Sequence, residues 1–158
     1  MKRVLSLVVP LGGVALLTLA VTAFAATPDR RGDRGRTITV IEHATTDATT
    51  DTGAPGDTAG DILTFANDVF NAADARKVGT DQGYCIRVVP RSSYECTWTT
   101  RLNGGHIVVS GPFRDAGDSV LAITGGTGRF RDASGTMNLH ALAGGTKFAF
   151  RFHVRRGR

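Results

Sequence analysis

The sequence predicts an all-β domain of short antiparallel strands, and three observations support this fold class. Twenty glycines stand against five prolines, which is typical of many tight turns rather than of a collagen-like or proline-rich rod. From residue 60 onward, short apolar stretches are separated by glycine turns, without the sustained 3.6-residue period of a long helix. In the last segment, apolar and polar residues alternate with a period of two, as in a strand with one buried and one wet face.

The number of segments favours closure into a barrel. Eight strands are expected, and a sheet of this size must hide its edges. An eight-stranded antiparallel β-barrel has an interior just wide enough for packed side chains or one small ligand. A β-sandwich with the same number of strands is the alternative, and composition and alternation do not separate the two.

Length and composition limit the chain to one ordinary domain. Of its 158 residues, 41% are hydrophobic and 21% are charged, and the formal net charge is +5. This length excludes a multidomain enzyme or a large α/β barrel. The charged fraction is too low for a disordered polyelectrolyte.

The N-terminus has the pattern of a signal peptide. Lys2 and Arg3 precede an apolar run at 4–21, and Ala23, Phe24 and Ala25 supply the small-x-small cleavage pattern. We expect residues 1–25 to be removed and the protein to be secreted, to the extracellular space or the cell envelope. A single anchoring helix is the alternative, since the run is close to the roughly 20 residues that span a bilayer. After cleavage no transmembrane segment is expected.

The expected barrel domain covers residues 37–154. Its strands are placed at 37–44, 61–68, 84–89, 93–101, 105–110, 118–123, 137–141 and 147–154. Residues 45–59, rich in Thr, Asp, Gly and Pro, predict an exposed loop, and 71–76 would allow one short helical turn. The arginine-rich segment 26–36 is expected to be flexible, and 155–158 to form a basic tail.

The last strand also bears on nucleic-acid binding. Cations next to aromatic residues are typical of single-strand stacking platforms. Here Lys147 and Arg151 alternate with Phe148, Phe150 and Phe152, so the two sets occupy opposite faces of the strand. The phenylalanines then belong to the core, and no nucleic-acid partner is expected.

The two cysteines predict a disulfide. Export would place Cys85 and Cys96 in an oxidising compartment. A turn centred on Pro90 and Arg91 would set the two cysteines directly opposite each other on neighbouring strands. Reactive thiols are the alternative, and no nearby His or Lys favours them.

Glu42 is the first candidate for chemistry. Ile38, Val40 and Glu42 share one strand face, so an inward face would carry a carboxylate into an apolar interior. Burial there would raise its pKa or require a hydrogen-bonding partner. Such a group could act as a general base or stabilise a developing cation. Alternatively, Glu42 lies near the strand end and reaches solvent.

Asn67 is the second candidate. Its amide both donates and accepts, so inside a barrel it could hold a water or a ligand oxygen. An asparagine at a strand end also commonly caps a turn, and the adjacent Asp68 suits that role.

Other motifs carry little weight. The glycine-rich run at 124–128 lacks the Gly-Lys-Ser/Thr ending and a following helix, so a phosphate loop is not predicted. The four histidines lack ligand spacing, so no metal site is expected. No serine has a nucleophile-elbow context.

Four motifs in order resemble the allene oxide cyclase family, whose barrel is related in architecture to the dirigent proteins. GDILTFAN at 60–67 resembles the family's GDxxxFxN, and KVGTDQGYC at 77–85 resembles RxGxxxGxC, with Lys77 in place of arginine. GHIVVSGPF at 105–113 resembles GHIxxxGPY, and LAITGGTGRF at 121–130 resembles LAITGGxGxF. The resemblance covers most of the chain after residue 39.

The resemblance implies an eight-stranded barrel with an apolar cavity, often assembled as a homotrimer. The plant cyclases bind an unsaturated fatty-acid epoxide, a bound water assists its opening, and a glutamate stabilises the delocalised cation. By motif, that glutamate corresponds to Glu42 and the water-holding asparagine to Asn67, both expected to be catalytic. Phe65 and Cys85 are expected to line the ligand cavity.

Two departures from the family pattern affect the water site. A second water-holding asparagine is replaced by Ala44, and a Ser-Pro pair is replaced by the Thr/Asp-rich loop. Because Glu42 and Asn67 are retained, we expect a secreted barrel that binds a hydrophobic small molecule and steers its cyclisation or coupling as an isomerase, without a cofactor, whereas the two departures favour the alternative. The alternative is a non-catalytic protein that sequesters a lipid or secondary metabolite, and a weaker one is an envelope protein whose basic tails contact anionic polymers.

Overall fold

The computed structural model describes residues 35–156. The expected signal peptide at 1–25 and most of the basic segment at 26–36 lie outside the described residues. Among the described residues, no helix is long and apolar enough to cross a membrane.

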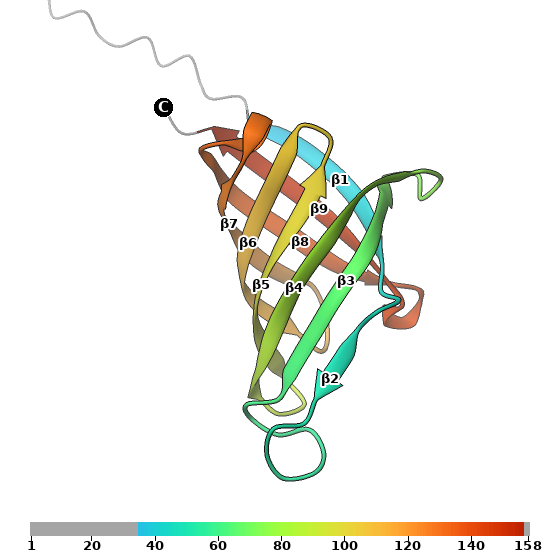
Figure 1. The fold of residues 1–158 in the computed structure, drawn as a ribbon, viewed down its shortest axis with the longest axis vertical. Helices are drawn as coiled ribbons and strands as arrows, with labels where there is room; N and C mark the ends of the chain where they lie inside the picture. The colour runs from blue at the N-terminus through green and yellow to red at the C-terminus, as the bar shows by residue number, and fades with distance from the viewer. Residues whose placement is uncertain (1–34, 157–158) are drawn as a thin grey trace, which may run out of the picture. The chain divides into compact units, whose positions relative to one another are not determined.

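The described chain is a closed antiparallel barrel of eight strands, with one short additional strand (Figure 1). The strands are β1 (Arg36–His43), β2 (Ala48–Thr50), β3 (Ile62–Asn71), β4 (Lys77–Val89), β5 (Ser93–Leu102), β6 (Gly105–Arg114), β7 (Ser119–Gly126), β8 (Ala133–Leu142) and β9 (Lys147–Arg156). Strands β3 to β9 pair in sequence order, and β1 closes the ring by pairing with both β9 and β3. The predicted barrel is confirmed, because a sandwich would leave this ring open.

The strands differ from expectation at several boundaries. Strand β1 begins one residue early, and β9 continues through Arg155 and Arg156, which pair with Ser134 and Ala133. Strand β4 begins at Lys77, because its first half contains glycines and polar residues that conceal the alternation. The short helical turn expected at 71–76 is a hairpin turn instead, closed by a hydrogen bond from the Asn71 N–H to the Arg76 carbonyl (2.9 Å).

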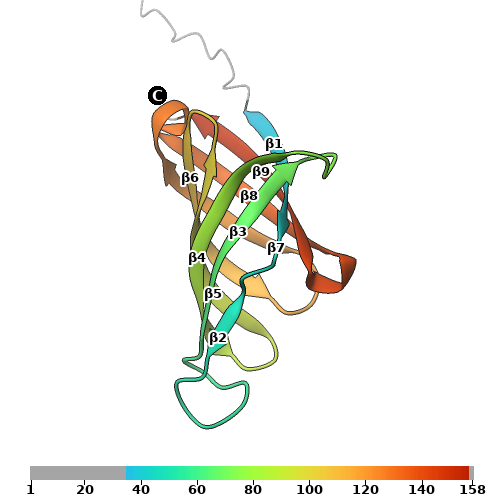
Figure 2. The same ribbon diagram turned by 45° about the vertical axis from the view of Figure 1, so that its right-hand side comes forward.

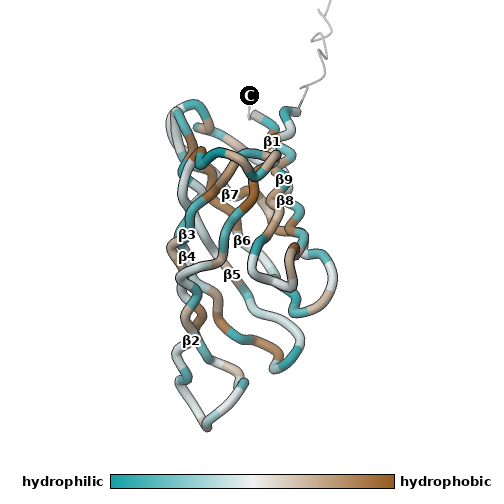
Figure 3. The backbone as a smooth tube through the Cα atoms, turned by 90° about the vertical axis from the view of Figure 1, so that its right-hand side faces the viewer, coloured by the Kyte–Doolittle hydropathy of each residue, from teal (hydrophilic) through white to brown (hydrophobic). Residues whose placement is uncertain are grey.

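Strand β2 lies within the stretch expected to be loop. It pairs only with β3, through residues 62–64. Figures 1 and 2 show β2 and the loop after it at one end of the barrel, beyond the start of β3. That loop is pale to teal in Figure 3, whereas the strands alternate between brown and teal, as expected for walls with one buried face.

The barrel interior is packed solid near the end where β1 begins. Its centre is formed by inward side chains that are at most 1% exposed, among them Val69, Ile107, Val109, Met137 and Phe152. Burying a side chain of this size stabilises the fold by about 1.5–3 kcal/mol. This part of the core supplies most of the apolar burial and leaves the opposite half of the barrel free for a cavity.

Cys85 and Cys96 form the predicted disulfide, with an S–S distance of 1.97 Å. They are direct partners in the pairing of β4 with β5. The register is the one expected for a turn centred between residues 90 and 91. Reactive thiols are therefore excluded, since the chain has no other cysteine.

Candidate functional site

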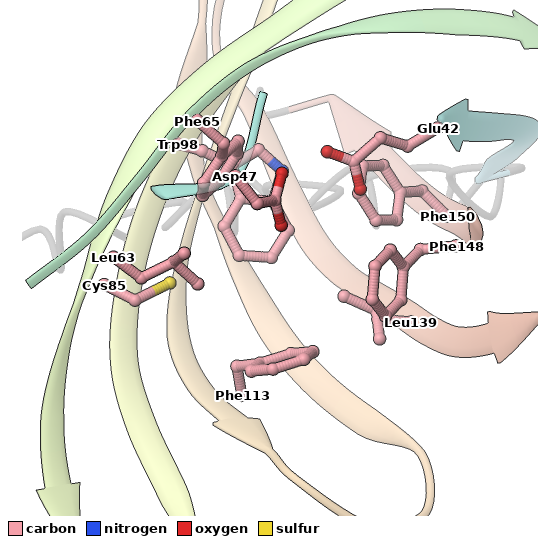
Figure 4. Close-up of a pocket in the computed structure, with 10 residues that line it drawn as sticks. All are labelled: Glu42, Asp47, Leu63, Phe65, Cys85, Trp98, Phe113, Leu139, Phe148 and Phe150. Carbon is pink, nitrogen blue, oxygen red and sulfur yellow. The ribbon is translucent and has the colours of Figure 1, made fainter. Parts of the chain in front are cut away.

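A cavity of about 140 Å³ occupies the half of the barrel nearest β2. Seven strands and the segment after β1 contribute to its wall. Its lining residues, drawn in Figure 4, are Glu42, Asp47, Leu63, Phe65, Cys85, Trp98, Phe113, Leu139, Phe148 and Phe150. The structure thus places three of the sequence-predicted site residues, Glu42, Phe65 and Cys85, at one cavity.

Aromatic rings form most of the wall. Trp98 lies between Phe65 and Phe150, with ring centroids 5.9 Å and 5.5 Å away. Phe113 meets Phe148 edge to face at 5.9 Å. These separations are within the range in which aromatic pairs attract each other beyond simple area burial.

Gly83 makes room for the Trp98 side chain. It pairs directly with Trp98 across β4 and β5. A Cβ at Gly83 would lie 2.3 Å from the Trp98 Cβ and 2.5 Å from the Thr97 carbonyl oxygen, both far inside contact distance. The second glycine of the motif at 77–85 therefore lets the indole pack against the cavity wall.

Glu42 is the buried polar group of the cavity. It lies near the end of β1, it is 5% exposed, and its Oε1 accepts a hydrogen bond of 2.8 Å from Asn67 Nδ2. Burial raises the pKa of Glu42 to about 7, although the Asn67 hydrogen bond opposes the shift. The side chain therefore faces the interior, as the alternation of Ile38, Val40 and Glu42 predicts.

Asn67 makes all of its hydrogen bonds within the protein. Its amide nitrogen donates to Glu42 and also to Asp47 Oδ1 (2.7 Å). Its oxygen accepts from the backbone N–H groups of Thr45 and Thr46 and from the Thr46 hydroxyl, each at 3.0 Å. The residue is 1% exposed and does not line the cavity. It positions the cavity carboxylates instead of facing the cavity itself.

Asp81 is a buried residue that the sequence analysis missed. It is 2% exposed on the inner face of β4, between Asn67 and Thr100 in register. Burial, followed by the charge of Glu42, raises the pKa of Asp81 to about 9, and neither of its carboxyl oxygens has a hydrogen-bond partner among the described residues. At neutral pH the two acids therefore hold at least one proton between them. Counting back in twos from Cys85 would have placed Asp81 inside.

Asp47 brings a second carboxylate to the cavity, from the segment between β1 and β2. The residue is largely exposed, and its bond to Asn67 sets it beside Glu42. Figure 4 shows these two carboxyl groups on one side of the cavity and Phe113 on the other. The polar and apolar parts of the wall are thus separated.

The loop from 51 to 60 is exposed along most of its length but is held at both ends. Asp61 accepts hydrogen bonds from the backbone N–H groups of Thr52 (3.1 Å) and Thr58 (2.7 Å). Arg87, 7% exposed, forms ion pairs with Asp57 (2.6 Å) and Asp115 (2.7 Å). The composition of this segment did not indicate these contacts.

Nothing in the described part of the chain brings three His, Cys, Asp or Glu side chains together as a metal site. His43 and His140 are instead paired with aspartates, at 2.6 Å from Asp74 and Asp118 respectively. The side chains that line the cavity supply carboxyl groups and aromatic rings.

Comparison with known proteins agrees with this architecture. The sequence profile of the allene oxide cyclase family matches residues 27–157. Among solved structures, a pyocyanin demethylase is 28% identical, with a TM-score of 0.63 over 73% of this chain and 98% of that one. A pterocarpan synthase dirigent protein is 14% identical (TM-score 0.64; 80% and 97% covered). A Diels-Alderase from Streptomyces koyangensis is also 14% identical (TM-score 0.63; 77% and 64% covered).

Since the family profile spans most of the sequence, from before β1 to the end of β9, and the fold has the expected strand order, the chain belongs to the allene oxide cyclase family.

Proposed function

We propose that this barrel binds a hydrophobic small molecule in its cavity and steers the cyclisation or coupling of that molecule. One observation carries the proposal. Glu42 is only 5% exposed and lies at the wall of a cavity that is lined mostly by aromatic rings. The side-chain amide of Asn67 holds its carboxyl group there through a hydrogen bond. Burying an acid costs folding free energy, and buried acids with strongly shifted pKa values are typical of functional sites.

The mechanism we propose uses shape and electrostatics. The aromatic wall restricts the substrate to few conformers, which lowers the entropic part of the barrier to ring closure. The carboxylate of Glu42 stabilises positive charge that develops on the substrate, more strongly than it would in water because the surroundings are apolar. Asn67 is a positioning residue that holds Glu42 and Asp47 through one nitrogen.

The comparisons support a role in such reactions without fixing the substrate. The names of the similar structures include a pterocarpan synthase dirigent protein and a Diels-Alderase, as well as a pyocyanin demethylase. This fold therefore serves several reactions of small organic molecules, and the substrate must be argued from the cavity of each protein.

The test compares the two glutamates of the chain. Glu95 lies exposed on the outer face of β5, so E95Q is a matched control for E42Q. The compound that copurifies with the protein from its host is identified by mass spectrometry and then used as substrate. We expect E42Q to lower turnover by about 100-fold or more with binding nearly unchanged, and E95Q to match the original protein. Equal turnover in E42Q would remove Glu42 from the mechanism.

A non-catalytic protein that sequesters a metabolite is the second candidate. Ala44 lacks the amide that the family uses to hold water, and Asn67 uses all of its hydrogen-bonding groups within the protein. These observations favour a site without an activated water. A single unmodified compound in both the original protein and E42Q would support this function, whereas a substrate and its cyclised product together would support catalysis.

We also propose that the protein is exported and that residues 1–25 are removed. The disulfide supports this proposal, because disulfides persist in oxidising compartments. The mass of the protein recovered from the extracellular or envelope fraction should correspond to a chain that begins at Ala26. A full-length chain retained with the membrane would instead support the anchoring helix.

A further inference from the structure

The ionisable groups of the cavity are all acidic. Its two ionisable lining residues are Glu42 and Asp47, and no Lys, Arg or His is among the ten described residues that line it. The amide of Asn67 is turned toward these carboxyl groups and is fully bonded. The cavity thus offers hydrogen-bond acceptors and negative charge to a ligand, but no cation to an anionic one.

The aromatic wall favours the same kind of ligand. Five rings surround the space, belonging to Phe65, Trp98, Phe113, Phe148 and Phe150. Faces of aromatic rings attract cations, with about 0.5–1 kcal/mol at exposed sites and about 2 kcal/mol or more where the cation is desolvated. Flat rings also stack with planar ligands. Carboxylates and rings together resemble the cages in which proteins hold organic cations.

The size of the cavity limits what can be enclosed. An engineered cavity of about 150 Å³ holds one benzene, and this cavity measures about 140 Å³. One aromatic ring therefore fits inside, and a second ring would extend into the mouth beside Asp47. The long chain of a fatty-acid epoxide would not be enclosed, and its carboxylate would face Glu42 and Asp47 with no counter-ion among the lining residues.

We propose that the cavity selects a planar aromatic molecule that carries a positive charge, in preference to neutral or anionic molecules of the same shape. This inference rests on the proposed function and narrows it, because it names the chemical class of the ligand. The ring inserts between Trp98 and Phe148, and the charge lies at the side of the cavity formed by Glu42 and Asp47. An anion there would meet like charge and lose its hydration without compensation.

The test uses three bicyclic probes of nearly equal shape: 1-methylquinolinium, 1-methylnaphthalene and 1-naphthoate. Affinities are measured by calorimetry, and the site of binding by the NMR signal of the indole N–H of Trp98. This signal is unique because the chain has a single tryptophan. We expect the cation to bind roughly 10-fold or more tightly than the neutral probe, and the anion to bind most weakly.

Variants of the two carboxylates distinguish their contribution to cation binding from that of the aromatic rings. E42Q and D47N should each reduce the preference for the cation over 1-methylnaphthalene, and together they should leave only the smaller preference that the aromatic rings contribute. Binding of the neutral probe should change little in these variants. E95Q, which changes the charge on the outer wall, should keep the full preference.

Two results would overturn this inference and leave the proposed function in place. One is binding of all three probes at Trp98 with equal affinity, and the other is a preference for the cation that is undiminished in the E42Q/D47N double variant. In both cases the barrel still binds small molecules, so the proposed function stands. If no probe moves the Trp98 signal at millimolar concentration, the cavity does not accept aromatic ligands, and both the inference and the proposed site are overturned.

Discussion

Asp81 is the residue whose position packing alone does not explain. A leucine or valine would fill the inner face of β4 at lower cost, yet the chain buries an acid there, against Glu42. Two adjacent carboxyl groups cannot both ionise cheaply, so one proton stays between them. Asp81 thus affects Glu42 through its proton and charge, while Asn67 holds Glu42 through a hydrogen bond.

This arrangement makes stability depend on pH. The pKa of Asp81 is raised from 3.8 to about 9 and that of Glu42 from 4.5 to about 7. Between about pH 4 and pH 9 the native protein keeps protons that the unfolded chain has released. The free energy of unfolding is therefore greatest at the acid end of this window and falls as the pH rises through it.

We expect D81N to flatten this dependence and to raise the free energy of unfolding at pH 8 by roughly 1–3 kcal/mol. The amide stays neutral at all pH values, so the cost of ionising a buried carboxyl group at this position is removed. Urea unfolding at a series of pH values measures the effect. D68N, which removes an exposed carboxylate paired with Lys77 at 2.6 Å on the outer face of β3, should keep the original pH dependence. A D81N profile as steep as that of the original protein would contradict the shared proton.

At the scale of elements, the segment between β1 and β2 is joined to the barrel through one side chain. Asn67, on β3, accepts three hydrogen bonds from Thr45 and Thr46, and the Thr46 hydroxyl in turn accepts from the Ala66 N–H at 2.8 Å. Asp47, which follows directly, lines the cavity. The position of this cavity wall is therefore set by β3 and not by the loop itself.

N67A should release this segment while leaving the strands paired. We expect hydrogen exchange of the Thr45 and Thr46 amides to become faster by 10-fold or more, since each loses the Asn67 oxygen that accepts its hydrogen bond. Exchange measured by NMR checks this residue by residue. T97V is the control, because it removes a hydroxyl hydrogen bond of 3.2 Å to the Val109 carbonyl, on β5 and β6, that does not involve the segment between β1 and β2. Unchanged exchange in N67A would show that other contacts fix the segment.

The alternation of inward and outward side chains along each strand explains which features of the fold could be predicted from the sequence. The register of the two cysteines and the inward side of β1 and β9 follow from a period of two, and both are found in the structure. The inward acid at position 81 and the start of β4 were missed because Gly79, Thr80, Gln82 and Gly83 interrupt the apolar pattern. The hydrogen bonds of Asn67 were also beyond the sequence, because they depend on how a loop returns to the barrel.

At the scale of the whole barrel, one half of the interior is filled and the other is hollow. Composition predicts that an interior of eight strands is narrow, but it does not say which phenylalanines pack together and which leave space. Phe150 marks the boundary, since it contacts Phe152 on the filled side (6.3 Å) and Trp98 on the cavity side. The homotrimer implied by the family resemblance stays a prediction.

Replacing one leucine by phenylalanine in each half of the barrel should distinguish the filled half from the hollow half. Leu63 lines the cavity, and Leu121 is 1% exposed in the filled core. We expect L121F to lower the free energy of unfolding by about 1–3 kcal/mol through overpacking. L63F should change it by less than about 1 kcal/mol, because the added atoms enter empty space. Thermal and urea unfolding measure both, and equal losses in the two variants would contradict a cavity beside Leu63.

The pairing of β1 with β9 has a consequence for how the polypeptide is made. Arg36 lies opposite Val154, so the ring joins residues from nearly opposite ends of the described chain. Until the final ten-residue strand, β9, has been synthesised, β1 and β8 each lack one of their two neighbouring strands and present an unpaired edge to other polypeptides. Folding that depends on contacts between residues so far apart in the sequence is slow. A polypeptide truncated before residue 147 would lack β9 and would yield an aggregation-prone fragment with unpaired strand edges instead of a smaller barrel.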